Sequence, residues 1–125
     1  MRTSIVPLFL SMALWLPGPV SADIRLVMVE ERGCIYCARW TEDVGTEYPL
    51  TPEGRFAPLE RVNIRDIPED LQLTSRPVYT PTFVLVDDGQ EVGRLEGYHG
   101  EEFFWGLLGR LLSQAREDWR ESVAE

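Results

Sequence analysis

The sequence contains no lysine, so arginine supplies all 12 basic side chains, against 21 acidic ones. The formal net charge is -9 at pH 7, and the arginines are dispersed along the chain. Proteins that bind the phosphate backbone of a nucleic acid need clustered cations. The composition therefore argues against a nucleic-acid partner.

Metal ligands are also scarce, because the chain has 1 histidine and 2 cysteines. Cys34 and Cys37 have the C-x-x-C spacing that also occurs in zinc sites, but a structural zinc site needs four ligands. His99 is the only histidine that could add to the pair. We therefore expect no bound metal. Metal binding by the two cysteines is the less favoured alternative.

Long apolar runs are absent except at the N-terminus. Arg2 precedes the almost wholly apolar residues 5–16, and two prolines and a glycine follow before Ser21 and Ala22. This order of a basic start, an apolar centre and small residues is typical of a cleavable secretory signal. The run is shorter than the roughly 20 residues that span a bilayer, so an uncleaved anchor is the less favoured alternative. We predict a signal peptide over residues 1–22, and no membrane insertion after its removal.

The two cysteines lie three positions apart, after the predicted signal. In an oxidising compartment, disulfides usually link segments that are distant in sequence. A bridge between near neighbours closes a tiny loop and restricts the unfolded chain little. Redox chemistry therefore explains the pair better than stability does, with a purely structural disulfide as the alternative.

The hydrophobic pattern predicts a single α/β domain over residues 23–125. β-rich runs alternate with segments whose apolar residues recur every three or four positions, as in amphipathic helices. The predicted order is strand, helix, strand, hairpin and helix, at residues 24–29, 34–47, 59–64, 80–96 and 101–119. A βαβ crossover followed by a ββα unit makes a mixed four-stranded sheet flanked by helices. Residues 49–58 are predicted as a loop, and residues 66–77 as irregular with one helical turn near 69–71.

Aromatic residues are assigned mainly to the core. Trp40 lies one helical turn beyond Cys37 and is predicted to be buried, with a substrate-facing edge as the alternative. The last helix carries an apolar stripe formed by residues 103, 104, 107, 108, 111, 112 and 115. Three adjacent aromatic side chains cannot all face inward, so Trp105 is assigned to the surface. Tyr36 and His99 are expected to be exposed near the cysteines.

Cys34 lies where the first predicted strand gives way to a helix. Unpaired backbone N–H groups and the positive end of the helix dipole converge there and favour an anionic sulfur. A lowered pKa makes such a cysteine a nucleophile near neutral pH. Cys37, almost one turn later, is close enough to attack a mixed disulfide at Cys34 and release the product. Gly33 keeps the approach to the sulfur uncrowded.

The second candidate element is the run Thr80-Pro81-Thr82 at the start of a predicted strand, a position that suits proline. A cis Thr80–Pro81 bond would aim the Thr80 backbone at an incoming peptide and place the proline ring beside the sulfurs. Most X-Pro bonds are trans, and an ordinary trans proline is the alternative. The C-x-x-C upstream favours the cis form.

These features together resemble the thioredoxin superfamily over essentially all of residues 23–125. Four runs narrow the resemblance to the periplasmic thioredoxin-like Sox proteins encoded with bacterial sulfur-oxidation enzymes: GCIYCARW at 33–40, YPLT at 48–51, TPTFVL at 80–85 and GRLEGY at 93–98. The resemblance implies a thioredoxin-like fold and a periplasmic, monomeric thiol–disulfide oxidoreductase. Its redox centre is the cysteine pair, so no cofactor is expected.

The resemblance also implies roles for individual residues and partners. Cys34 and Cys37 would be catalytic, Thr80 and Pro81 would position the substrate, and the supporting residues would be Gly33, Ile35 and Tyr36. The substrate would be an exported protein with a cysteine or disulfide, namely a sulfur-carrier protein. A membrane thiol carrier would donate the electrons.

Two departures from thioredoxin itself bear on proton transfer. Gly33 stands where thioredoxin has a tryptophan before the first cysteine. Met28 stands where thioredoxin has a buried acid. Proton transfer to Cys37 would then need another group, such as Glu30 or water, although a solvated carboxylate is the favoured interpretation of Glu30.

The charges near the cysteines predict the direction of electron flow. Ile35 and Tyr36 bring no cation to the thiolate, and Glu30 and Glu31 oppose it, with Arg32 as a partial offset. A less stabilised thiolate means a more stable disulfide and a more reducing protein. We therefore predict a reductase. The alternatives are a reductase for cytochrome c maturation or general disulfide repair, and a non-catalytic redox-sensing module on the same scaffold.

Overall fold

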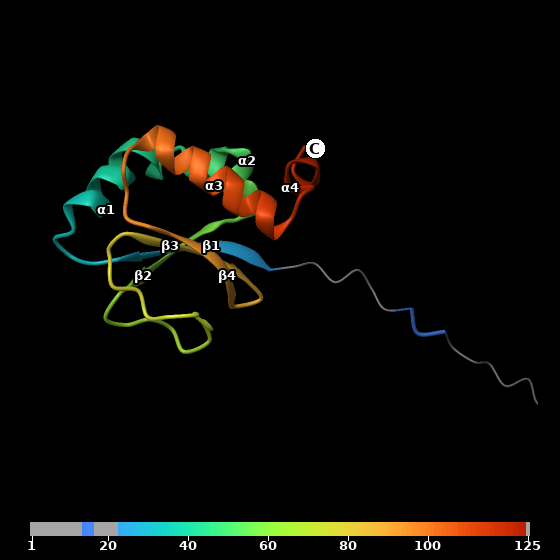
Figure 1. Cartoon of the computed structure of the whole chain (residues 1–125). Coiled ribbons are helices and arrows are strands. Elements are labelled where there is room, and N and C mark those ends of the chain that lie inside the picture. The colour runs from blue at the N-terminus through green and yellow to red at the C-terminus, as the bar shows by residue number, and fades with distance from the viewer. Residues whose placement is uncertain (1–13, 17–22, 125) are drawn as a thin grey trace, which may run out of the picture.

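A four-stranded sheet forms the centre of the protein, in a computed structural model that describes residues 14–16 and 23–124 (Figure 1). The strand order is β2-β1-β3-β4, and the strands are β1 (Ile24–Glu30), β2 (Leu59–Asn63), β3 (Thr82–Asp87) and β4 (Gln90–Glu96). β1 and β2 are parallel, whereas β1 and β3, and β3 and β4, are antiparallel. The mixed sheet predicted from the sequence is confirmed. The predicted signal, residues 1–22, lies largely outside the described residues.

The helices gather on one side of the sheet, and the connection from β2 to β3 runs along the other side (Figure 1). They are α1 (Ile35–Trp40), the π-helix η1 (Thr41–Gly45), the 3-10 helix η2 (Tyr48–Leu50), α2 (Pro52–Phe56), α3 (Glu101–Ala115) and α4 (Trp119–Ser122). In the described part of the chain, none of these helices has the length and apolar character needed to cross a membrane.

Three predicted boundaries need correction. The loop predicted over residues 49–58 contains α2, because Thr51 caps its N-terminus and Pro52 occupies the first helical turn, where proline is tolerated. The last predicted helix ends at Ala115, and the chain forms the separate helix α4 after a break. Near residues 69–71 the chain forms a single hydrogen-bonded turn and no helix, with the Leu71 N–H donating to the Pro68 carbonyl over 3.2 Å.

The hairpin between β3 and β4 agrees with its prediction. Asp88 and Gly89 both have positive φ angles, 49° and 81°. Two-residue hairpin turns of this kind need such backbone conformations, which asparagine, aspartate and glycine adopt most readily. The Asp-Gly pair in the sequence therefore identified the turn correctly.

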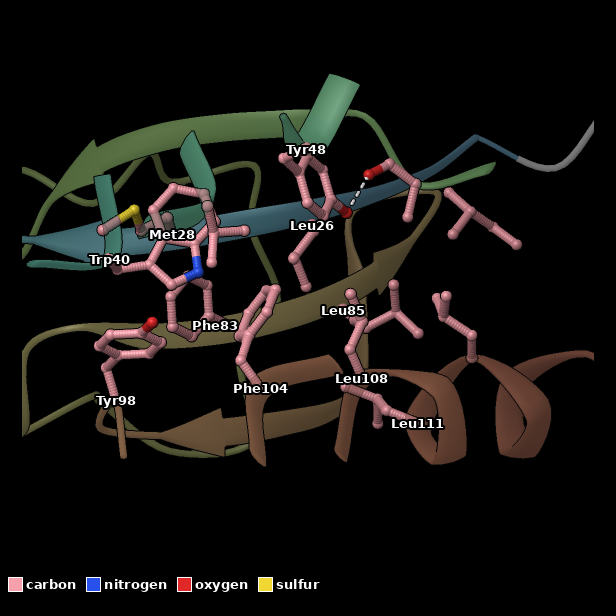
Figure 2. Close-up of a cluster of buried hydrophobic side chains, with 14 of the residues drawn as sticks. Leu26, Met28, Trp40, Tyr48, Phe83, Leu85, Tyr98, Phe104, Leu108 and Leu111 are labelled. Carbon is pink, nitrogen blue, oxygen red and sulfur yellow. Dashed lines mark hydrogen bonds between the residues drawn. The ribbon is translucent and has the colours of Figure 1, made fainter. Parts of the chain in front are cut away.

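β1 lies inside the sheet and is buried on both faces. Leu26 and Met28 belong to the cluster under the helices, and Val27 and Val29 belong to the cluster on the opposite face. The alternation follows from the period of two in a strand. The larger cluster is aromatic at its centre, where the Phe83 and Phe104 rings lie 5.0 Å apart between centroids (Figure 2).

One assignment of the aromatic residues was wrong. Trp40 is fully buried, as predicted. Trp105, however, is half-buried and stacks on Tyr48 with an interplanar angle of 11°, whereas Phe103 is 65% exposed. The two residues flank the buried Phe104 on opposite sides of α3. The side of α3 that faces Tyr48 is covered. The sequence pattern does not indicate which side of the helix this is.

The opposite face of the sheet is covered by the irregular segment before β3. Its side chains Ile67, Leu71 and Leu73 pack against the valines of the sheet. The segment then follows the outer edge of β4, where Glu91 N–H donates to the carbonyl of Gln72 over 3.0 Å. An edge strand that would otherwise expose unpaired backbone groups is thus partly covered.

A charged pair on β4 fixes this segment. Arg94 and Glu91 are 2.6 Å apart, and their side chains are 13% and 3% exposed. The Arg94 guanidinium also donates to the Ser75 carbonyl over 2.7 Å, and Glu91 accepts from the Thr74 N–H over 2.8 Å. Hydrogen bonds from Arg94 hold the pKa of Glu91 below its ordinary value, although burial opposes this.

We expect Glu91→Gln to lower the free energy of unfolding by about 1–2 kcal/mol at pH 7, because it removes charged hydrogen bonds from a buried pair. A carboxyl group whose pKa is depressed in the folded state stabilises the protein above its unfolded pKa. That contribution fades as the pH falls from about 4.3, the ordinary glutamate pKa, through the lower folded value. The difference between variant and wild type should therefore shrink towards pH 3 in urea unfolding. Glu47→Gln, at an exposed position, is the control, and a difference that stays constant with pH would contradict this account.

Candidate functional site

Cys34 and Cys37 form a disulfide, with their Cα atoms 5.3 Å apart. The chain leaves β1, turns at Gly33 with a φ of +82° and enters α1 at Cys34. A Cβ built at Gly33 would meet no atom within 4 Å. The positive φ, and not crowding, is therefore the local reason for glycine at this position.

Cys34 caps the N-terminus of α1. Its backbone is extended, with φ -74° and ψ 107°, and its Sγ accepts a hydrogen bond from the Cys37 N–H over 3.1 Å. An oxygen of serine, threonine or aspartate usually fills this role. Here the sulfur takes the place of that oxygen, so a thiolate at Cys34 would receive a backbone N–H and the positive end of the helix dipole.

The two sulfurs differ in access. Cys34 is half-buried, whereas Cys37 is only 6% exposed and belongs to the aromatic core cluster. Between them, Ile35 and Tyr36 are exposed, as predicted for Tyr36. A reagent from solvent therefore meets Cys34 first, and Cys37 is reached through it.

Residues 79–81, the proline loop that precedes β3, form the other wall of the site. The Thr80–Pro81 peptide bond is cis, and Pro81 is buried. An open cavity of about 480 Å³ is lined by Tyr36, Tyr79, Thr80, Glu96, Gly97, Tyr98 and His99. It brings Tyr36, from between the cysteines, together with Thr80, and His99 lies exposed at the same cavity.

Four cavity residues were not identified from the sequence as site residues: Gly97 and three that contribute a side chain. Tyr79, Glu96 and Tyr98 come from loops or strand ends, where no periodicity marks a functional side chain. The only available signal was their place beside residues that were identified, since Tyr79 precedes Thr80 and Tyr98 precedes His99.

Tyr98 differs from the other tyrosines of the cavity because it is only 5% exposed. Its hydroxyl donates to Oδ2 of Asp43, in η1, over 2.7 Å. Burial, followed by this hydrogen bond to a carboxylate, raises the pKa of Tyr98 well above its usual value. The phenol therefore remains a neutral donor at any physiological pH.

The acidic residues near the disulfide are paired with arginines. A carboxylate oxygen of Glu30 lies 2.7 Å from a guanidinium nitrogen of Arg61, and one of Glu31 lies 3.0 Å from a guanidinium nitrogen of Arg65. Their repulsion of a thiolate at Cys34 is thus weaker than the sequence alone suggested. Met28 is fully buried at the position where thioredoxin has its acid.

Glu30 reaches the cysteines only indirectly. Arg61 donates to Oε2 of Glu30 and also to Oγ1 of Thr41, over 3.0 Å. The Thr41 hydroxyl in turn donates to the Cys37 carbonyl over 2.9 Å. In the described part of the chain, no hydrogen bond joins Glu30 to either sulfur, which favours its interpretation as a surface carboxylate.

Metal binding gains no support from the arrangement of ligands. Among residues 14–16 and 23–124, no group of three or more Cys, His, Asp and Glu side chains lies close enough together to hold a metal ion. The cysteine pair itself can form and break a disulfide, which requires no other group to carry the electrons.

A mixed sheet flanked by helices, with a disulfide at the start of the first helix and a proline loop across the cavity, defines a thiol–disulfide oxidoreductase with a thioredoxin-like fold. Comparison with protein-family models gave no match, and comparison with curated proteins gave none. Among solved structures, the chain is similar to the periplasmic thioredoxin SoxS from Paracoccus pantotrophus in its reduced form, with 52% identity and a TM-score of 0.73. The match covers 75% of this chain and 100% of that chain. The chain therefore belongs to the thioredoxin-like Sox proteins of the thioredoxin superfamily.

The difference in access predicts which cysteine reacts first in the reduced protein. We expect limited iodoacetamide at pH 7 to alkylate Cys34 at least about tenfold faster than Cys37, because Cys34 combines exposure with the helix N-terminus. Peptide mass spectrometry after quenching at short times measures both rates. Faster labelling of Cys37 would contradict the assignment of the outer and inner sulfur.

Proposed function

We propose that the protein is a periplasmic thiol reductase that keeps a cysteine of an exported sulfur-carrier protein reduced. The observation that carries this proposal is the pairing of a half-exposed Cys34 at the helix N-terminus with a buried Cys37. The similarity to a periplasmic thioredoxin SoxS supports the compartment. Residues 1–22 would direct export and then be removed.

The first step is attack by the Cys34 thiolate on a sulfur of the partner's disulfide. One S–S bond forms between Cys34 and the partner, the partner's own S–S bond breaks, and its second sulfur leaves as a thiolate that takes up a proton. The Cys37 N–H bonded to Sγ of Cys34 stabilises the attacking thiolate. The partner chain lies along the cavity beside Thr80 and Pro81, which position its backbone.

The second step releases the product. Cys37 loses its proton to solvent and attacks Sγ of Cys34, so the mixed disulfide breaks and the partner's remaining sulfur leaves as a thiolate. The product is the Cys34–Cys37 disulfide, the state found in this structure. Two electrons have passed to the partner. A membrane thiol carrier would then reduce the disulfide and restore the enzyme.

The surroundings of Cys34 favour a reducing protein. Ile35 and Tyr36 carry no positive charge, and the nearest guanidinium on the same helix, that of Arg39, lies over the Tyr36 ring at 5.7 Å. The thiolate is therefore stabilised mainly by backbone groups. Strong oxidants of this superfamily owe their potential to a more strongly stabilised thiolate.

Equilibration with glutathione tests this direction. We expect a reduction potential near that of thioredoxin, about −270 mV, and far below the roughly −120 mV of a strong oxidant. The measurement is the fraction of reduced protein, read by mass spectrometry after acid trapping, across a series of glutathione ratios. A potential near −120 mV would contradict the assignment as a reductase.

A Cys37→Ser variant should trap the partner. It retains the attacking sulfur but lacks the resolving one, so the mixed disulfide accumulates. Expressed in the native host with its signal, the variant should yield a dithiothreitol-sensitive adduct containing an exported sulfur-carrier protein, identified by mass spectrometry. Cys34→Ser is the matched control and should give no adduct. Recovery of a cytochrome c maturation protein, or of many unrelated exported proteins, would replace the sulfur carrier as the substrate.

A further inference from the structure

The loop between β4 and α3 contacts both walls of the site through two consecutive residues. The Gly97 N–H donates to the carbonyl of Pro81 over 2.8 Å. The hydroxyl of Tyr98 donates to Oδ2 of Asp43 over 2.7 Å, across 55 positions of sequence. Pro81 belongs to the proline loop, and Asp43 belongs to η1, the direct continuation of the helix that carries the cysteines.

The Tyr98 side chain is well placed to couple the position of the proline loop to that of η1. Its ring is 5% exposed and lies 6.4 Å from that of Phe104 between centroids, at the end of the aromatic cluster (Figure 2). A buried ring has little freedom to follow an independent motion of either wall. Its hydroxyl donates to a carboxylate, and such charge-assisted hydrogen bonds are stronger than neutral ones.

A second link between the two walls lies in the core, where Trp40 of α1 packs against Phe83 of β3 with ring centroids 5.2 Å apart. Tyr36 and Tyr79 line the cavity from opposite sides, yet both side chains are more than half exposed, at 51% and 60%. Within the proline loop, the Tyr79 carbonyl accepts a hydrogen bond from the Thr82 hydroxyl over 2.6 Å. This bond stabilises the loop but does not reach the helix. At the cavity, hydrogen bonds of Gly97 and Tyr98 therefore join the proline loop to η1.

We propose that Tyr98 is a positioning residue that fixes the proline loop relative to α1 and η1, the helices that follow Cys34. Through this it sets the affinity of the site for disulfides within a protein chain. This inference rests on the proposed reductase function, because it assumes that a peptide lies between the two walls. Tyr98 does not exchange electrons or protons with the substrate. A small disulfide that needs no peptide-binding surface should react independently of it.

Kinetics with insulin and a dithiol donor test the inference. Tyr98→Phe keeps the ring and removes the hydroxyl, and we expect KM for insulin to rise about threefold to tenfold, the factor that one net hydrogen bond contributes. Both kcat and the rate of reaction with 2-hydroxyethyl disulfide should stay within about twofold of wild type. An unchanged KM, or an equal loss with the small disulfide, would overturn the role in positioning.

Tyr48→Phe is the matched control. Tyr48 is also a buried tyrosine, and its hydroxyl donates to the Ala57 carbonyl over 2.6 Å (Figure 2). It is not among the residues that line the cavity. This variant loses stability in the same manner but should keep the wild-type KM. Asp43→Ala should reproduce the effect of Tyr98→Phe, and the double variant should add nothing further, because the two side chains form one interaction. A KM that rises equally in the Tyr48 variant would assign the effect to stability alone and overturn the inference.

Hydrogen exchange separates the inference from the proposed function. The Gly97 amide, which donates to Pro81, should exchange at least about threefold faster in Tyr98→Phe than in wild type under native conditions, because one end of the link is free. Tyr48→Phe should leave that amide unchanged. Wild-type protein that fails to reduce insulin would refute the reductase function, yet faster exchange at Gly97 would still support the link. Unchanged exchange would refute the link, whatever the turnover.

Discussion

The hydrogen bond from the Cys37 N–H to Sγ of Cys34 is the interaction on which the site depends. It requires the chain to turn at Gly33, after β1, and to begin a helix directly after Cys34. The sulfur then occupies the position of a capping oxygen and meets backbone donors that the helix cannot satisfy internally. The sulfur therefore needs no charged side chain close to it. The nearby Glu30 and Glu31 are each paired with an arginine.

Keeping α1 in place requires the aromatic cluster beneath it. Trp40 is fully buried against Phe83 of β3 and Phe104 of α3, with ring centroids 5.2 Å and 5.6 Å apart. The helix is therefore anchored to β3, the strand that directly follows the proline loop. The irregular segment on the opposite face of the sheet leads into that loop. It is held in place by the hydrogen bond from Arg94 to the Ser75 carbonyl. The two walls of the cavity thus pack on one aromatic cluster and are joined at the cavity by the hydrogen bonds of Gly97 and Tyr98.

The sequence determined much of this in advance because the relevant signals were local. The β-rich run of β1, the Asp-Gly turn and the C-x-x-C after a strand each depend on neighbouring residues, and the sheet and the disulfide follow from them. What escaped prediction depends on distant contacts. Residues 49–58 were predicted as a loop, although Thr51 supplies a cap that starts α2. The hydrogen bond between Tyr98 and Asp43 spans the fold, and neither residue stands in a recognisable pattern. The ion pairs of Glu30 and Glu31 were likewise invisible, so the sequence overstated their effect on the sulfur.

We infer that backbone groups at the start of α1 stabilise a thiolate at Cys34. The absorbance of the thiolate at 240 nm as a function of pH tests this most directly in a Cys37→Ser variant, where Cys34 is the only sulfhydryl. We predict a transition with a midpoint clearly below about 8.5, the pKa of an ordinary cysteine. A midpoint at or above that value would show that the helix N-terminus does not activate this sulfur and would contradict the account.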